Sequence, residues 1–167
     1  MQTARPLAPR GIVTKPSAKK YDALRGLTPQ QVDELYGWLL PKTVQANEYV
    51  FHEGESPDGM YLLMTGHVVI VKESGRGKFR LAELEAPNYF GEMALLSPGP
   101  RSASARAVRE STLGFLPAAT FNQKLANNNL VAFRIALNVG KLLAERMRET
   151  NTTLSRKAAI SMRMKWG

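Results

Sequence analysis

The stretch NYFGEMALLSPGPRSASARA, residues 88–107, places a short apolar segment between a glycine and a rigid turn. Gly91 precedes the segment EMALL, which predicts a short helix whose first backbone N–H groups have no partner within the helix. A Pro-Gly-Pro turn follows and brings Arg101 back towards the start of that helix. The stretch therefore predicts a place where amide N–H groups and a guanidinium converge.

These groups have the chemistry of an anion site. The start of a helix attracts anions, and the planar fork of Arg101 can bind a phosphodiester through two parallel hydrogen bonds. Glu92 would repel a bare phosphate, but its carboxylate is a good acceptor for ribose hydroxyls. The set fits a sugar joined to an anionic phosphate. A helix turn in which Glu92 and Arg101 form only a surface ion pair remains open on the spacing alone.

The composition is that of one globular domain. The 167 residues are 44% hydrophobic and 22% charged, which is typical of a folded chain. The absence of cysteine excludes a disulfide framework, a thiol nucleophile and a cysteine metal site. No apolar run approaches the roughly 20 residues that cross a bilayer, and the first residues lack a signal-peptide pattern. We therefore expect a cytoplasmic protein without a membrane span.

The net charge of +9 is concentrated at the two ends of the chain. Residues 1–28 carry six basic residues against one acid, and residues 155–167 carry four basic residues and no acid, whereas the middle is neutral. Basic ends bind acidic proteins, RNA or membrane surfaces, or are simply solvated. The expected segments are a flexible basic arm (1–20), the folded domain (21–155) and a basic tail (156–167).

The hydrophobic pattern predicts a mainly β fold with flanking helices. The segment TPQQ has an N-cap threonine, a proline at the first helical position and a glutamine three residues after the cap, which predicts a helix from Pro29 to about Leu40. Short β-type runs then alternate with turns, which predicts antiparallel strands that close into a β-roll or jelly-roll barrel. The runs are TVQ, YVFH, MYLLM, HVVIVK, FRLAEL, SARAV and TLGFL, and the glycines expected at positive φ in the turns are Gly54, Gly59, Gly66, Gly75 and Gly77. Two further helices are expected, a short one at 118–126 and a long one at about 129–155.

The long helix carries two apolar stripes. The first repeats at steps of three and four residues, a heptad spacing that predicts pairing with another helix. It comprises Leu130, Phe133, Leu137, Gly140, Ala144, Met147, Asn151 and Leu154. The second stripe, Ile135, Val139 and Leu142, is expected to lie on the barrel. We expect a homodimer through residues 130–154, with a single helix buried on two sides of a monomer as the alternative.

The stretch FGEMALLSPGPRSASARA resembles the phosphate-binding cassette of cyclic-nucleotide-binding domains, whose pattern is F-G-E-x-A-L, a variable turn and then R-[ST/A]-A. The nine-residue step from Glu92 to Arg101 matches members of the catabolite activator and protein kinase A regulatory-subunit type. The stretch EYVFHEGESPDGMYLLMTGHVVIV resembles the glycine-punctuated first half of that family's barrel. The order helix, barrel, short helix, long helix is also similar, over residues of about 21–155.

The resemblance implies the roles of individual residues. Glu92 would accept from the ribose 2′-OH and would also pair with Arg146 of the long helix. Thr150 and Asn151 would contact the base, although Asn151 departs from the serine of relatives. The cyclic phosphate would be held by Gly91, Glu92, Met93, Ala94, Arg101, Ser102 and Ala103, and the base would lie against Val71, Leu81 and Leu84. The implied ligand is cAMP. The second candidate is cGMP, because a hydroxyl such as that of Ser102 accompanies recognition of either nucleotide in relatives.

We therefore expect a cyclic-nucleotide sensor that signals through its long helix and dimer seam to a protein effector. No catalytic residue, cofactor or metal is assigned, because the two histidines lie far from the cassette and supply neither a positioned base nor a metal-bound water. Too few residues follow the long helix for a recognition helix, so we expect a stand-alone bacterial member without sequence-specific DNA binding. The alternatives are a degenerate, non-binding dimeric interaction module that acts through its basic tails, and a non-specific nucleic-acid binder.

Overall fold

The computed structural model describes residues 21–74, 77–97 and 99–166. The expected basic arm, residues 1–20, lies outside the described residues. The elements in chain order are η2 (Asp22–Leu24), α1 (Pro29–Tyr36), β1 (Leu40–Val44), β2 (Tyr49–Phe51), β3 (Gly59–Ser74), β4 (Gly77–Glu85), β5 (Asn88–Phe90), η3 (Glu92–Leu95), β6 (Ser104–Pro117), α2 (Ala118–Ala126) and α3 (Leu130–Trp166).

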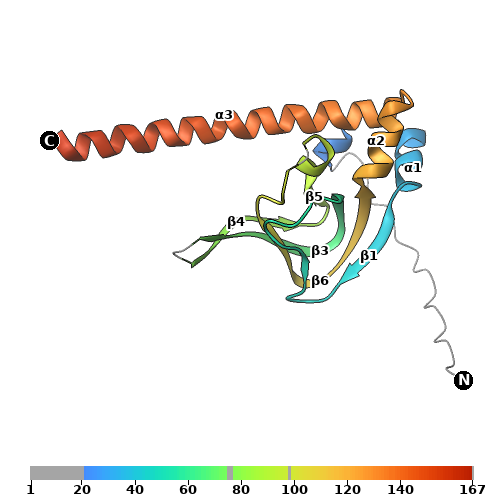
Figure 1. The fold of residues 1–167 in the computed structure, drawn as a ribbon, viewed down its shortest axis with the longest axis horizontal. Helices are drawn as coiled ribbons and strands as arrows, with labels where there is room; N and C mark the ends of the chain where they lie inside the picture. The colour runs from blue at the N-terminus through green and yellow to red at the C-terminus, as the bar shows by residue number, and fades with distance from the viewer. Residues whose placement is uncertain (1–20, 75–76, 98, 167) are drawn as a thin grey trace, which may run out of the picture.

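The strands form one six-stranded antiparallel sheet. Its hydrogen-bonded path runs β1-β6-β3-β4, with β2 paired to β6 and β5 paired to β3. The expected mainly β fold with flanking helices is confirmed, but the expected closure into a barrel is wrong. The sheet is open because, among the described strands, β1 and β4 end the path without pairing to each other. The β3–β4 hairpin projects away from β1 instead (Figure 1).

Two strands run through positions where turns are expected. The runs MYLLM and HVVIVK form the single strand β3, and SARAV and TLGFL form β6. Gly66 has a φ of +99° and lies within β3, where the register against β6 shifts. A Cβ at Gly66 would overlap the Ser111 side chain, so glycine is required by close approach of the two strands as well as by φ. Gly54 and Gly77 also have positive φ, as expected, whereas Gly59 does not. The expected turn glycine Gly75 lies outside the described residues.

The helix starts follow from the sequence better than the helix ends. At α1 the Thr28 hydroxyl accepts from the Gln31 N–H at 3.3 Å, and the Gln31 side chain accepts from the Thr28 N–H at 3.0 Å. α1 ends at Tyr36, short of the expected Leu40, because Leu40 pairs with Phe115 and begins β1. The expected short helix at 118–126 is confirmed as α2.

α3 is longer than expected. It continues past residue 155 to Trp166, so residues 156–166 prolong the helix and do not form a separate tail. The segment SRKAAISMRMKW contains neither glycine nor proline and is rich in good helix formers. Within the described residues, no helix combines the length and the hydropathy that crossing a membrane requires.

The first half of α3 is fixed to the rest of the domain. Ile135 and Val139 are fully buried in a cluster with Tyr21 and Leu24, as expected for the second apolar stripe. The Asn138 side chain donates to the carbonyl groups of residues 23 and 25 at 3.1 and 2.8 Å. The second half of α3 extends beyond this cluster and over the β3–β4 hairpin (Figure 1).

Candidate functional site

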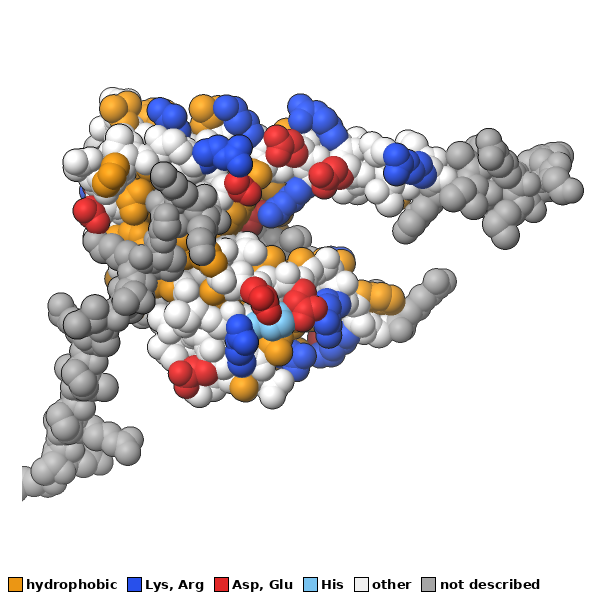
Figure 2. Space-filling model, turned by 180° about the vertical axis from the view of Figure 1, so that it is seen from behind, with side chains coloured by type: hydrophobic (Ala, Val, Ile, Leu, Met, Phe, Trp, Pro, Cys, Tyr) orange, Lys and Arg blue, Asp and Glu red, His pale blue; other side chains and the backbone are white. Residues whose placement is uncertain are grey.

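A cavity of about 730 Å³ lies between the sheet, the segment 91–103 and α3. This volume is in the range of small-molecule sites. The space-filling view shows α3 projecting above the sheet with an open hollow beneath it (Figure 2). All of the site residues expected from the sequence line the cavity except Val71 and Asn151. Those that line it are Gly91, Glu92, Met93, Ala94, Arg101, Ser102, Ala103, Leu81, Leu84, Arg146 and Thr150.

The expected short helix forms as the 3₁₀ turn η3. Gly91 precedes it in the left-handed conformation, with a φ of +74°, which glycine adopts without strain. The Ala94 N–H donates to the Gly91 carbonyl at 3.2 Å. The N–H groups of Glu92 and Met93 have no acceptor in the described part of the chain. Two donors are therefore available at the cavity wall.

Arg101 is the best-buried charged group of the cavity, with only 6% of its surface exposed. Its guanidinium donates to the Gly59 carbonyl at 2.8 Å and to the Gly91 carbonyl at 3.2 Å. It also stacks over the Phe51 ring, 4.0 Å from the centroid. Its Nε is buried and has no hydrogen-bond partner among the described residues. One N–H of a rigidly held cation thus remains unused.

Asp58 is a member of the site that the sequence did not predict. Its carboxylate accepts from the Arg101 Nη2 at 2.5 Å and from the Tyr61 hydroxyl at 3.3 Å. Burial, with the nearby Asp58 charge, raises the pKa of Tyr61 to about 12, so the hydroxyl remains a donor at neutral pH. The Asp58 carboxylate balances the guanidinium charge, and its side chain is more than half exposed, so it can move aside for another anion.

Glu92 and Arg146 connect η3 to α3. The Arg146 Nη1 donates to Glu92 Oε1 at 2.6 Å, as the resemblance implied. The Glu92 side chain is nearly buried, whereas that of Arg146 is more than half exposed. The second carboxylate oxygen of Glu92 has no donor in the described residues and remains an acceptor at the cavity. This ion pair is a direct link between the cavity wall and the long helix.

One face of α3 forms the roof of the cavity. Leu143, Arg146, Met147 and Thr150 are spaced at three and four residues and line the cavity together. The Thr150 hydroxyl donates to the Arg146 carbonyl at 2.9 Å, which leaves its oxygen lone pairs as acceptors. Asn151 is exposed and does not line the cavity, because one further residue rotates its side chain by about 100° around the helix. Leu143 was not predicted as a site residue, although its spacing from Thr150 was a usable signal.

The sheet contributes the apolar wall. Ile70 lines the cavity and Val71 does not, because neighbouring residues of a strand face opposite sides of the sheet. The register between β3 and β4 shifts at this point: Ile70 lies opposite Ala82, and Val71 lies opposite Arg80. Leu81 is the extra residue at the shift and reaches the cavity. The expectation that Val71 is part of the wall was therefore wrong, because the face was misassigned.

This combination of a coiled sheet, a buried guanidinium with free amides and a helical roof has the chemistry of a site for a small anionic ligand. A family model, the cyclic nucleotide-binding domain, matches residues 41–128. Because this match covers more than half of the sequence, the chain belongs to the cyclic nucleotide-binding domain family. Cyclic nucleotide binding, regulation and signal transduction are the properties of that family.

Individual relatives agree with the family match. The chain is 32% identical over 130 residues to the cyclic AMP receptor protein of Thermus thermophilus, covering 77% of this chain and 58% of that protein. It is 27% identical over 132 residues to the CRP-like cAMP-activated global transcriptional regulator of Mycobacterium tuberculosis, covering 78% and 57%. The solved structure of the Thermus thermophilus catabolite activator protein matches with a TM-score of 0.73 at 30% identity, covering 80% of this chain and 62% of that chain. The chain thus spans less than two thirds of the length of these relatives.

Proposed function

We propose that the cavity binds a purine cyclic mononucleotide, with cAMP as the preferred ligand. The observation that carries the proposal is the buried Arg101 guanidinium, whose Nε lacks a partner among the described residues. The phosphate would replace Asp58 as the anionic partner of Arg101 and would accept from the free N–H groups of Glu92 and Met93. Charge-assisted hydrogen bonds contribute about 1.5 to 3 kcal/mol each, so three of them support an affinity in the micromolar range, about 8 kcal/mol.

The sugar and base would use the remaining acceptors. The free carboxylate oxygen of Glu92 is suited to the ribose 2′-OH. The Thr150 oxygen is suited to a donor because its own proton is used within the helix. Adenine presents an amino group on the edge where guanine presents a carbonyl, which favours cAMP over cGMP. The proposed activity is binding without turnover, and no cofactor takes part.

Occupancy would be reported by α3. Arg146 is held by one carboxylate oxygen of Glu92, and the other oxygen would accept from the ribose hydroxyl, so the ligand and α3 would share one carboxylate. A ligand shifts a conformational equilibrium only by its differential affinity for the two states. The cavity supplies such a difference because its floor belongs to the sheet and its roof to α3. The signal would then pass from the helix to a protein effector.

Calorimetry of the unaltered chain with cAMP, cGMP and 5′-AMP tests the proposal. We expect saturable binding of one cAMP per chain with a micromolar dissociation constant, and weaker binding of cGMP. The open monoester 5′-AMP is expected to bind at least tenfold more weakly, since a doubly charged, unrestrained phosphate does not match a site built around one guanidinium. Absence of heat with both cyclic nucleotides would support the alternative of a non-binding interaction module.

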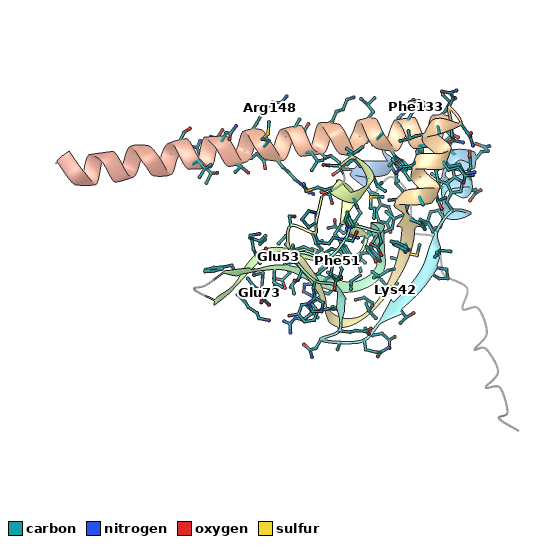
Figure 3. The ribbon with its side chains drawn as sticks, viewed as in Figure 1. Lys42, Phe51, Glu53, Glu73, Phe133 and Arg148 are labelled. Carbon is teal, nitrogen blue, oxygen red and sulfur yellow. The ribbon has the colours of Figure 1, made fainter. Side chains whose placement is uncertain are left out.

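A second copy of the chain is the proposed partner of the exposed stripe on α3. Leu130, Leu137 and Leu154 are each more than half exposed in the single chain. Phe133 points away from the sheet (Figure 3). At Gly140 nothing lies within 4 Å of the position of a Cβ, so a second backbone can approach closely there. In the proposed dimer these residues would form the heptad seam between the two copies of α3.

Leu137→Glu tests the dimer. The unaltered chain is expected to sediment as a dimer, and Leu137→Glu as a monomer, because the substitution places a carboxylate in the middle of the seam from both copies. Val108→Glu, which alters an exposed apolar side chain of β6, is the matched control and should remain dimeric. A monomeric unaltered chain at micromolar concentration would contradict the proposed dimer.

A further inference from the structure

A lysine of the sheet donates a hydrogen bond to the segment 91–103, which lines the cavity. Lys72 of β3 donates to the Ser102 carbonyl and to Glu53 Oε1, each at 2.8 Å. The Glu53 N–H donates to the Ser104 hydroxyl at 2.8 Å, and Ser104 is buried. Three segments that are distant in sequence, around residues 53, 72 and 103, are therefore joined at one point directly beside Arg101.

Glu53 keeps Lys72 in place. Its second oxygen accepts from the Glu73 N–H at 3.2 Å, and the two glutamates lie next to each other in Figure 3. The hydrogen bond from Lys72, followed by that from the Glu73 N–H, lowers the pKa of Glu53, so its carboxylate is ionised at neutral pH. The ammonium group of Lys72 is thus directed by a fixed negative charge onto a backbone carbonyl.

That carbonyl belongs to a peptide group whose other end is at the cavity. The Ser102 C=O and the Ala103 N–H are the two halves of one trans peptide and point in opposite directions. Lys72 contacts the C=O half, Ala103 lines the cavity, and the Ala103 N–H has no acceptor in the described residues. A cation bonded to the carbonyl polarises the peptide and makes its N–H a stronger donor.

We propose that Lys72, oriented by Glu53, is a positioning residue for phosphate recognition: it fixes the 102–103 peptide and strengthens the Ala103 N–H as a donor to one of the two exocyclic phosphate oxygens. This inference rests on the proposed function of the cavity. It adds to that function a residue that does not touch the ligand and that lies outside the segment 88–107. Lys72 acts on affinity for the phosphate and not on the choice of base.

The test combines variants of Lys72 with sulfur-substituted ligands. Calorimetry would use cAMP and its two phosphorothioate diastereomers, in which sulfur, a weak acceptor, replaces one or the other of the two exocyclic phosphate oxygens. Lys72→Met is expected to bind cAMP about tenfold more weakly than the unaltered chain, the loss of one polarised hydrogen bond. For one diastereomer, Lys72→Met should again bind about tenfold more weakly than the unaltered chain. For the other, the difference between the two proteins should fall to about threefold or less, because sulfur has already removed the hydrogen bond from the Ala103 N–H. Lys72→Arg should restore binding of cAMP to within about threefold.

Two controls separate positioning from a loss of structure. Lys78→Met removes another exposed lysine of the same hairpin, paired to Glu73 at 2.6 Å, and should leave all three affinities unchanged. Glu53→Gln keeps a neutral acceptor for Lys72 and should weaken cAMP less than Lys72→Met does. An equal penalty for cAMP and both diastereomers, or an unchanged affinity of Lys72→Met, would overturn the inference while leaving the proposed function intact. Failure of the unaltered chain to bind any of the nucleotides would overturn both.

Discussion

Arg101→Met is expected to weaken the binding of cAMP by at least a hundredfold. The substitution keeps an unbranched side chain of similar length but removes the cation and its fork of donors. Two charge-assisted hydrogen bonds to phosphate, at about 1.5 to 3 kcal/mol each, are lost, and each 1.4 kcal/mol corresponds to a factor of ten. Calorimetry of the variant against the unaltered chain measures the effect.

The same substitution should also destabilise the empty domain. Arg101 donates to the carbonyl groups of Gly59 and Gly91, and both acceptors lose this donor in the variant. We expect the free energy of unfolding in urea to fall by about 1 to 3 kcal/mol. Arg101→Lys, which keeps the charge but not the planar fork, should show intermediate affinity.

Arg80→Met is the matched control for this experiment. Arg80 is an exposed arginine that forms an ion pair with Glu83 at 2.7 Å and does not line the cavity. Its removal should change neither the affinity nor, beyond about 0.5 kcal/mol, the stability. If Arg101→Met bound cAMP within threefold of the unaltered chain, the phosphate would have to lie elsewhere.

Gly91→Ala is the second substitution with a large expected effect. A Cβ at this position would lie 2.6 Å from the Arg101 Nη1, so the guanidinium must shift. The left-handed φ of +74° adds a cost of about 1 to 2 kcal/mol for a residue with a Cβ. We expect the affinity for cAMP to fall at least tenfold and the free energy of unfolding to decrease by about 2 to 3 kcal/mol. Calorimetry and urea unfolding give the two values.

Gly26→Ala separates the backbone effect from the effect on Arg101. Gly26 has a nearly identical φ of +79°, its nearest neighbour is the flexible end of Arg134, and neither residue lines the cavity. This variant should lose about 1 to 2 kcal/mol of stability and keep its affinity for cAMP. Equal losses of affinity in Gly26→Ala and Gly91→Ala would show that close approach to Arg101 is not the cause.

The parts of the site that are local in sequence could be predicted. Gly91, Glu92 and Arg101 lie within one stretch whose turn and helix signals determine their relative positions, and all three line the cavity. The Arg146–Glu92 contact followed from the resemblance and is present at 2.6 Å. The mainly β architecture followed from the change of hydrophobic period, and the start of α1 from its capping box.

The parts that depend on tertiary contacts could not be predicted. In the sequence, Asp58 has the pattern of any polar turn residue. Only folding brings it to Arg101, which is 43 residues away along the chain. Val71 was expected at the cavity, but its neighbour Ile70 lines the cavity instead, and which face of β3 is turned to the cavity depends on tertiary contacts. The link from Lys72 to Ser102 spans 30 residues and likewise has no local signal. The predicted ends of two helices were wrong. α1 ends earlier than predicted because the next residues pair as a strand, and α3 ends later than predicted because its last residues are good helix formers.

A crystal structure of the chain with cAMP would test the central claim most directly. The account predicts the cyclic phosphate within hydrogen-bonding distance of the Arg101 guanidinium and of the N–H groups of residues 92, 93 and 103. Asp58 should have been displaced from Arg101, and the base should lie beneath Thr150. A nucleotide bound outside this cavity, or an Arg101 still paired with Asp58 at full occupancy, would contradict it.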